Sequence, residues 1–238
     1  MRIALIGYGK MGQAIKALGE KQGDSFPLVI DLDNSNELNA ANVKDIDAAI
    51  EFTSPVSAPE NILACIDLGL PVVSGTTGWN ERFGEVEKRC IQEKGAFFYA
   101  SNFSIGVNIL FAMNRKLAGI MNRFPEYRAS MEEVHHIHKL DAPSGTALTL
   151  ANQIIDRQKQ VNSWSLTTPA DPSIIHIESI REGEVKGKHT IEYESALDTI
   201  TLSHNAKSRD GFAAGALMAA AYIKDQKGIF GMEELLNL

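Results

Sequence analysis

The run from residue 135 to residue 147, HHIHKLDAPSGTA, concentrates groups that carry protons. Three of the chain's six histidines lie within four residues, and Lys139 follows them. A continuous strand would point these side chains to both faces, so they address one ligand only if the strand ends inside the cluster. Ser144 is a good helix N-cap, and Gly145 and Thr146 would then present backbone N–H groups that bind a carboxylate or phosphate. The run predicts an anion site beside a proton donor.

Other interpretations of this run stay open. Histidine is the commonest zinc ligand, but the adjacent His135 and His136 lack ligand spacing and no cysteine supports them, so we expect no metal. A structural role at a strand end is a second alternative. Serine hydrolysis through Ser144 lacks the G-x-S-x-G elbow. Aldehyde dehydrogenase chemistry would need a loop cysteine, and neither cysteine lies near these motifs.

A glycine motif near the amino terminus predicts a dinucleotide site. Gly7, Gly9 and Gly12 form G-x-G-x-x-G between an apolar strand and an amphipathic helix, and Asp31 ends the next strand, 19 residues beyond Gly12. The glycines permit a tight turn, approach of a pyrophosphate and close helix packing, while the acidic residue accepts from ribose hydroxyls. The cofactor contacts expected here are Gly7, Gly9, Lys10, Met11, Gly12 and Asp31.

The residues around Asp31 also favour one cofactor. A carboxylate at Asp31 repels a 2′-phosphate, and Leu32 and Asp33 offer no arginine to receive one. Lys10 can still supply positive charge from the glycine loop, so NADPH remains an alternative. We therefore expect NADH to be the preferred reductant.

Two further loops follow strand-like runs of the same predicted sheet. Ligands of an open parallel sheet bind beyond the carboxyl ends of its strands, where small and hydroxylated residues leave room for a nicotinamide. Two ordinary turns are the alternative. The additional cofactor contacts expected in these loops are Gly75, Thr76, Thr77, Ala100, Ser101, Asn102 and Phe103.

The order of elements indicates two domains of different class. Alternating strands and helices in the first hundred residues predict a Rossmann-like parallel sheet covered on both faces, and the later strands predict an α+β domain with a mixed sheet. The apolar helix from Gly211 lacks a local partner and should return to the first domain. The expected strands are 2–6, 26–30, 48–52, 71–73, 96–99, 127–136, 174–180, 188–194 and 199–204, and the expected helices 10–22, 58–68, 81–94, 105–124 and 145–160.

Composition sets limits on partners and location. The chain has 238 residues, 44% of them hydrophobic, and a formal net charge of -7, which argues against a nucleic-acid or anionic-membrane surface. The longest nearly uncharged run, residues 211–223, is too short to span a bilayer. The amino terminus shows no signal peptide, and Cys65 and Cys90 stand alone. We expect a cytoplasmic protein.

Taken together, these motifs resemble the dihydrodipicolinate reductase (4-hydroxy-tetrahydrodipicolinate reductase) family of bacterial lysine and diaminopimelate biosynthesis. The run H-H-x-H-K-x-D-A-P-S-G-T-A is highly specific, and the similarity covers essentially the whole chain in the family's order. The matching segments are residues 52–55, 75–78, 102–108, 133–147 and 204–209.

The resemblance implies a reaction and separate roles for residues. A hydride from NAD(P)H reduces a cyclic unsaturated dicarboxylate, and a proton is added at the neighbouring carbon. His135 is similar to the family's proton donor or acceptor and Lys139 to its proton donor. A substrate carboxylate is then held by His136, Gly145 and Thr146, and the carboxy-terminal Arg209 and Phe212 resemble residues near the nicotinamide.

The resemblance also implies an assembly. Residues 1–104 and 209–238 would form the dinucleotide-binding domain, and residues 105–208 the domain that binds substrate and joins a homotetramer. Two rival functions are another two-domain NAD(P)-dependent dehydrogenase of amino or keto acids and a dinucleotide-binding module without catalysis. The second rival should tolerate loss of the histidine and lysine cluster.

Overall fold

The computed structural model describes residues 1–208 and 210–238. Two compact units make up the chain: Met1–Ile105 with Asp210–Leu238, and Gly106–Arg209. The carboxy-terminal helix thus returns to the amino-terminal unit. Within the described residues, none of the helices has both the length and the apolar character needed to cross a bilayer.

A six-stranded sheet forms the centre of the first unit. Its order is β11-β5-β4-β3-β1-β2, and every neighbouring pair is parallel. Strands covered on both faces need not alternate in polarity, which is why β1 and β3 are nearly continuous apolar runs. The strands are β1 (Arg2–Ile6), β2 (Ser25–Ile30), β3 (Ala48–Glu51), β4 (Val72–Ser74), β5 (Ala96–Tyr99) and β11 (Gly228–Phe230).

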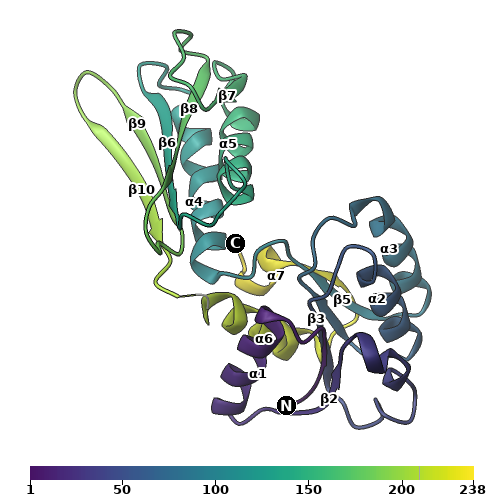
Figure 1. Ribbon diagram of the computed structural model, residues 1–238. Helices are drawn as coiled ribbons and strands as arrows, with labels where there is room; N and C mark the ends of the chain where they lie inside the picture. Colours follow the sequence, from purple (N-terminus) through teal and green to yellow (C-terminus); the bar gives the residue numbers. More distant parts are fainter. Residues whose placement is uncertain (209) are drawn as a thin grey trace. The chain divides into compact units, whose positions relative to one another are not determined.

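Helices cover both faces of this sheet (Figure 1). On one face α1 and α6 pack on Ile3 and Leu5, and on the other α2 and α3 pack on Ala4 and Ile6. Successive β1 side chains therefore enter different cores, as the two-residue period of a strand requires. The helices are α1 (Lys10–Lys21), α2 (Ala58–Asp67), α3 (Phe83–Gln92), α6 (Asp210–Ile223) and the short α7 (Met232–Leu236).

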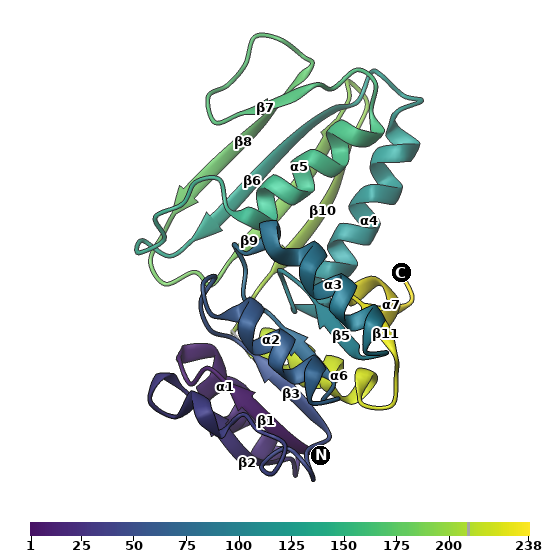
Figure 2. The ribbon, with the colours of Figure 1, turned by 90° about the vertical axis from the view of Figure 1, so that its right-hand side faces the viewer.

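The second unit is a five-stranded mixed sheet with two helices on one face (Figure 2). Its order is β10-β9-β6-β8-β7; β6 runs parallel to β8 and antiparallel to β9. The predicted fold class is confirmed in both units. The elements are α4 (Ile105–Met121), β6 (Arg128–His135), α5 (Gly145–Arg157), β7 (Ser163–Ser165), β8 (Ile174–Arg181), β9 (Lys188–Glu194) and β10 (Thr199–Asn205).

The differences from the sequence prediction concern short elements and helix ends. The strands β7 and β11 have three residues each, and the helix α7 has five, which is too few to show a period. The predicted helices 105–124 and 145–160 end earlier, at Met121 and Arg157. The predicted helix 81–94 splits into a 3-10 turn, Asn80–Arg82, and α3.

Gly215 of α6 generates a prediction about the first unit. A Cβ at this position would lie 1.9 Å from the carbonyl oxygen of Phe103, so Gly215→Ala forces backbone to move. We expect the free energy of unfolding to fall by about 1–3 kcal/mol, measured by urea denaturation.

Gly84→Ala in α3 is the matched control, because a Cβ there meets nothing within 4 Å. This variant should be neutral or more stable by about 0.5–1 kcal/mol. Equal stabilities of the two variants would contradict the close contact of α6.

Candidate functional site

The glycine loop between β1 and α1 is shaped by two close backbone contacts. Gly7 has φ +95°, and a Cβ there would lie 2.1 Å from the carbonyl oxygen of Phe52. A Cβ on Gly12 would lie 2.1 Å from the carbonyl oxygen of Gly7. Gly9, the residue before α1, has nothing within 4 Å of its Cβ position. The loop therefore needs glycine for its fold at two positions and leaves open space at the third, where a pyrophosphate can approach the helix start.

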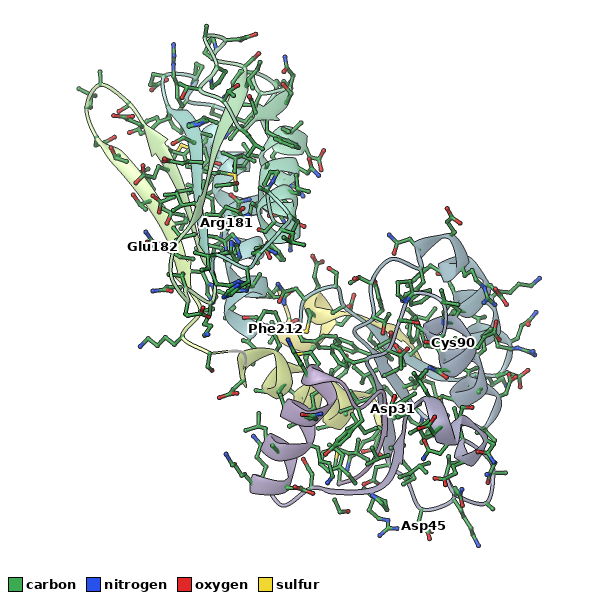
Figure 3. All side chains as sticks on the ribbon, in the orientation of Figure 1. Asp31, Asp45, Cys90, Arg181, Glu182 and Phe212 are labelled. Carbon is green, nitrogen blue, oxygen red and sulfur yellow. The ribbon has the colours of Figure 1, made fainter. Side chains whose placement is uncertain are left out.

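Strand order brings the other predicted cofactor residues to the same sheet edge. Because all these strands are parallel, the segments after β1, β2, β4 and β5 leave the sheet on one side. Asp31 follows β2, and its exposed carboxylate accepts a hydrogen bond of 2.9 Å from the backbone of Leu32 (Figure 3). The side chain of Leu32 is 89% exposed. A ribose bound at this edge would lie near the carboxylate of Asp31, and neither position 31 nor position 32 provides an arginine.

A buried carboxylate that the sequence prediction missed ties two of these loops together. Glu51, at the end of β3, is fully buried and accepts from Ser74 Oγ at 2.6 Å and Thr76 Oγ1 at 2.9 Å. It also accepts from the backbone N–H of Thr53 at 2.9 Å. Burial raises the pKa of Glu51, while the hydrogen bonds from Ser74 and Thr53 oppose that change. Thr76 therefore holds its loop in place with its hydroxyl.

Some of the residues predicted to touch the cofactor pack inside the first unit. Ala100 and Phe103 are buried, and the Phe103 ring lies 5.6 Å from the ring of Phe52. A Cβ at Gly75 would meet that Phe52 ring at 2.2 Å. These side chains shape the loops from within. The predicted Arg209 lies outside the described residues, and Phe212 is half-buried in the first turn of α6 (Figure 3).

The histidine and lysine cluster begins where β6 ends, at His135. Glu133 lies two residues earlier on the same face of the strand and is fully buried. Both of its carboxylate oxygens accept from the backbone N–H of Ser144 at 3.1 Å. Ser144 in turn caps α5, since its Oγ accepts from the N–H of Ala147 at 3.2 Å. The predicted helix start thus lies directly against the strand end, and Gly145 opens the helix.

Two buried histidines lie beside this carboxylate. His135 Nδ1 is 3.6 Å from Glu133 Oε2, and His189 Nε2 is 3.1 Å from Ser144 Oγ. Burial lowers the pKa of His135 against the opposing effect of Glu133, and burial with the nearby His135 lowers the pKa of His189 to about 4. Burial raises the pKa of Glu133, but its hydrogen bonds with Ser144 bring it below the ordinary value. At neutral pH the carboxyl is ionised and both imidazoles are neutral.

The other members of the cluster, Lys139, His136 and His138, differ in their contacts and exposure. Lys139 Nζ donates to both carboxylate oxygens of Asp141 at 2.8 Å, and this hydrogen bond holds the pKa of Asp141 below its usual range. His136 is half-buried. His138 is exposed and lies 3.2 Å from Glu184. The ammonium of Lys139 is thus paired with Asp141, and the ring of His136 lies 5.9 Å from that of the exposed His138.

Arg181 completes this arrangement and was not foreseen from the sequence. It ends β8 beside His135 and contacts Glu133 Oε1 at 3.3 Å. It also donates to the carbonyl oxygen of Lys139 at 3.3 Å and to that of Asp141. No local motif marks Arg181, whereas Glu133 has a local signal, its position two residues before His135 in a strand.

A metal was not expected here, and the geometry shows how the potential ligands are used. One atom each from Glu133, His135 and His189 lie within 4.8 Å of one another. The carboxylate already accepts from Ser144 and is paired with the guanidinium of Arg181, whose positive charge opposes a cation. These contacts favour a hydrogen-bonded network of protein groups.

Known proteins resemble this chain over nearly its whole length. Residues 1–103 match the family model "Dihydrodipicolinate reductase, N-terminus", and residues 106–236 match "Dihydrodipicolinate reductase, C-terminus". A 4-hydroxy-tetrahydrodipicolinate reductase of Christiangramia forsetii is 46% identical over 100% of this chain and 98% of that protein. The protein of that name from Neisseria gonorrhoeae is 33% identical over 94% and 84%.

The fold has a counterpart among solved structures. A dihydrodipicolinate reductase from Paenisporosarcina sp. TG-14, solved with dipicolinate bound, has a TM-score of 0.78 and 24% identity, with 98% of each chain covered. Since two family models together cover nearly all of the sequence, the chain belongs to the dihydrodipicolinate reductase family.

Proposed function

We propose that the protein catalyses the NAD(P)H-dependent reduction of 4-hydroxy-tetrahydrodipicolinate to tetrahydrodipicolinate in lysine and diaminopimelate biosynthesis. The observation that carries the proposal is the convergence, at the end of β6, of His135, Lys139 and the start of α5 in a chain of this family. These groups combine an anion site with proton carriers, which the reduction of a dicarboxylate requires.

In this proposal, residues 1–104 with 209–238 form the dinucleotide-binding domain. Open space at Gly9 and the adjoining start of α1 receive the pyrophosphate, with Lys10 and Met11 at the first helical positions. Asp31 accepts from the ribose. When bound, the reduced nicotinamide supplies the hydride. The further cofactor contacts proposed at the same sheet edge are Ser101, Asn102 and the backbone of residues 75–77. Phe212, in α6, is the last proposed contact.

Residues 105–208 form the domain that binds the dicarboxylate. Gly145 and Thr146 form the first turn of α5, where backbone N–H groups and the helix dipole stabilise a carboxylate. His136 donates to the same group. The ionised Glu133 lies behind Ser144 and takes no part in substrate contact, because its oxygens already accept from protein donors.

Lys139 donates the proton. The 4-hydroxy substrate first loses water, which leaves a conjugated imine. Hydride addition to that imine leaves negative charge on the ring, and a nearby ammonium quenches it by protonating the neighbouring carbon. His135 is neutral before substrate binds, because burial lowers the pKa of its imidazole. The negative charge of the dicarboxylate favours the protonated form, so His135 exchanges a proton only in the complex.

NADH is the preferred reductant, and the surroundings of Asp31 support this choice. A 2′-phosphate would stand against the carboxylate of Asp31 and next to the apolar, 89% exposed Leu32. A cytoplasmic homotetramer joined through the second unit is part of the same proposal. Within the described residues of that unit, both helices lie on one face of the sheet, which leaves the other face for a partner subunit (Figure 2).

An assay with freshly generated product of dihydrodipicolinate synthase tests the function directly. Oxidation of NADH or NADPH should depend on that product. No oxidation with either cofactor would contradict the proposal and favour one of the rival functions, a dehydrogenase of amino or keto acids or a binding module.

Removing either proton carrier should separate chemistry from cofactor binding. In Lys139→Ala and His135→Ala, kcat should fall by about 10²–10⁴-fold, the usual contribution of a positioned acid or base. The Kd for NADH, measured by fluorescence titration, should stay within about twofold, since these residues belong to the second unit.

Lys159→Ala, at an exposed position beyond α5, is the control and should keep the parent kcat. Loss of NADH affinity in parallel with kcat would overturn the assigned roles.

Exchanging the residues after β2 should change the cofactor preference. The double variant Asp31→Ser, Leu32→Arg removes a repulsion and adds a charge-assisted donor worth about 1.5–3 kcal/mol. The ratio of kcat/KM for NADPH to that for NADH should rise by at least about tenfold. Asp225→Ser, on an exposed turn, should leave the ratio unchanged. A lower KM for NADPH than for NADH in the parent protein would contradict the preference for NADH.

A further inference from the structure

The residues around Lys139 have little apolar packing, although Pro143 further along the segment is buried. Leu140, next to Lys139, is 97% exposed, and Ile137 is 60% exposed. The segment 136–144 contains no helix or strand. A proton donor on such a segment would sample many positions unless polar contacts hold the backbone, because each free residue keeps its conformational entropy.

Arg181 supplies those contacts from a different strand. Its Nε donates to the carbonyl oxygen of Lys139 at 3.3 Å, and its Nη2 donates to the carbonyl oxygen of Asp141. The two carbonyl groups flank Leu140, so one guanidinium fixes the backbone on both sides of it. Asp141 in turn holds Lys139 Nζ with both carboxylate oxygens at 2.8 Å. The position of the ammonium thus depends on Arg181.

Glu133 holds the other end of the segment, at Ser144, and contacts the same guanidinium of Arg181. The carboxylate accepts from the backbone N–H of Ser144 through both oxygens and from Arg181 through Oε1. Burial of the Glu133 carboxylate costs desolvation free energy. A pair of apolar residues in place of such a buried ion pair would often stabilise the sheet to the same extent. What the ionic pair adds is a fixed geometry between Lys139 and the start of α5.

We infer that Arg181 is a positioning residue for the reaction. Its ion pair with Glu133 fixes the segment 139–144, so that the Lys139 ammonium and the start of α5 contact the same substrate molecule. Arg181 touches no substrate in this inference; it acts through the backbone of Lys139 and Asp141. The inference rests on the proposed function for the role of Lys139. A guanidinium suits the task because its planar fork reaches several acceptors at once, which one ammonium does not.

The variants Arg181→Lys and Arg181→Met separate geometry from charge. Both should lower kcat by about 10–100-fold and leave the KM for NADH within about twofold, as expected for a misplaced donor group. If Arg181 only neutralised Glu133, R181K would retain the parent kcat, and that result would overturn the inference. Arg128→Met, at the opposite end of the sheet, is the matched control and should leave kcat unchanged.

Chemical rescue of a variant without the guanidinium is a second, independent test of the inference. In Arg181→Ala, guanidinium chloride at millimolar concentrations should restore part of kcat, whereas equal concentrations of sodium chloride should not. A guanidinium ion can refill the space between the two carbonyl groups and Glu133 without a covalent tether. Equal effects of the two salts on a folded R181A protein would also overturn the inference.

A readout without turnover distinguishes this inference from the proposed function. Trace acetylation of the whole protein with acetic anhydride, followed by mass spectrometry, reports the reactivity of each lysine. Lys139 should react several-fold faster in R181K than in the parent protein, while Lys159 keeps its rate. An unchanged rate at Lys139 would overturn the inference even if the reductase assay succeeds. A parent protein without reductase activity would refute the function alone.

Discussion

The polar site of the second unit depends on the buried carboxylate of Glu133. An ionised group without access to water must be satisfied by its neighbours, and here the neighbours come from separate parts of the chain. Ser144 brings the start of α5, Arg181 brings the end of β8, and His135 follows on the same strand. The contacts of this one carboxylate thus bring the start of α5, His135 and Arg181 together around the end of β6.

The first unit uses a related arrangement with hydroxyl partners. Glu51 lies at the carboxyl end of β3 and accepts from Thr53, Ser74 and Thr76, which belong to the loops after β3 and β4. The pKa of Glu51 is raised, because the effect of burial outweighs its hydrogen bonds, whereas the pKa of Glu133 is lowered, because its hydrogen bonds with Ser144 and the nearby His135 outweigh burial. Both carboxylates order loops at a sheet edge, and neither is placed to touch a ligand.

The charge states of the side chains near the end of β6 affect what this site can bind. His135 and His189 are neutral at neutral pH because burial lowers the pKa of both imidazoles, so the positive charges near the end of β6 come from the side chains of Lys139 and Arg181. A dianionic substrate would meet an ammonium and a helix N-terminus before it meets a charged imidazole.

Local patterns in the sequence were sufficient for much of the fold and for half of the site. The glycine spacing of residues 7–12, the N-cap at Ser144 and the end of a strand inside the histidine cluster depend on neighbours a few positions apart. The structure contains all three, with β6 ending at His135, one residue before the predicted end. The short elements β7, β11 and α7 were missed, because a period cannot be detected in so short a run. The tertiary structure alone decided which distant groups meet. Arg181 reaches Glu133 across 48 positions, and Ser74 reaches Glu51 across 23, through strand pairing that no local motif encodes.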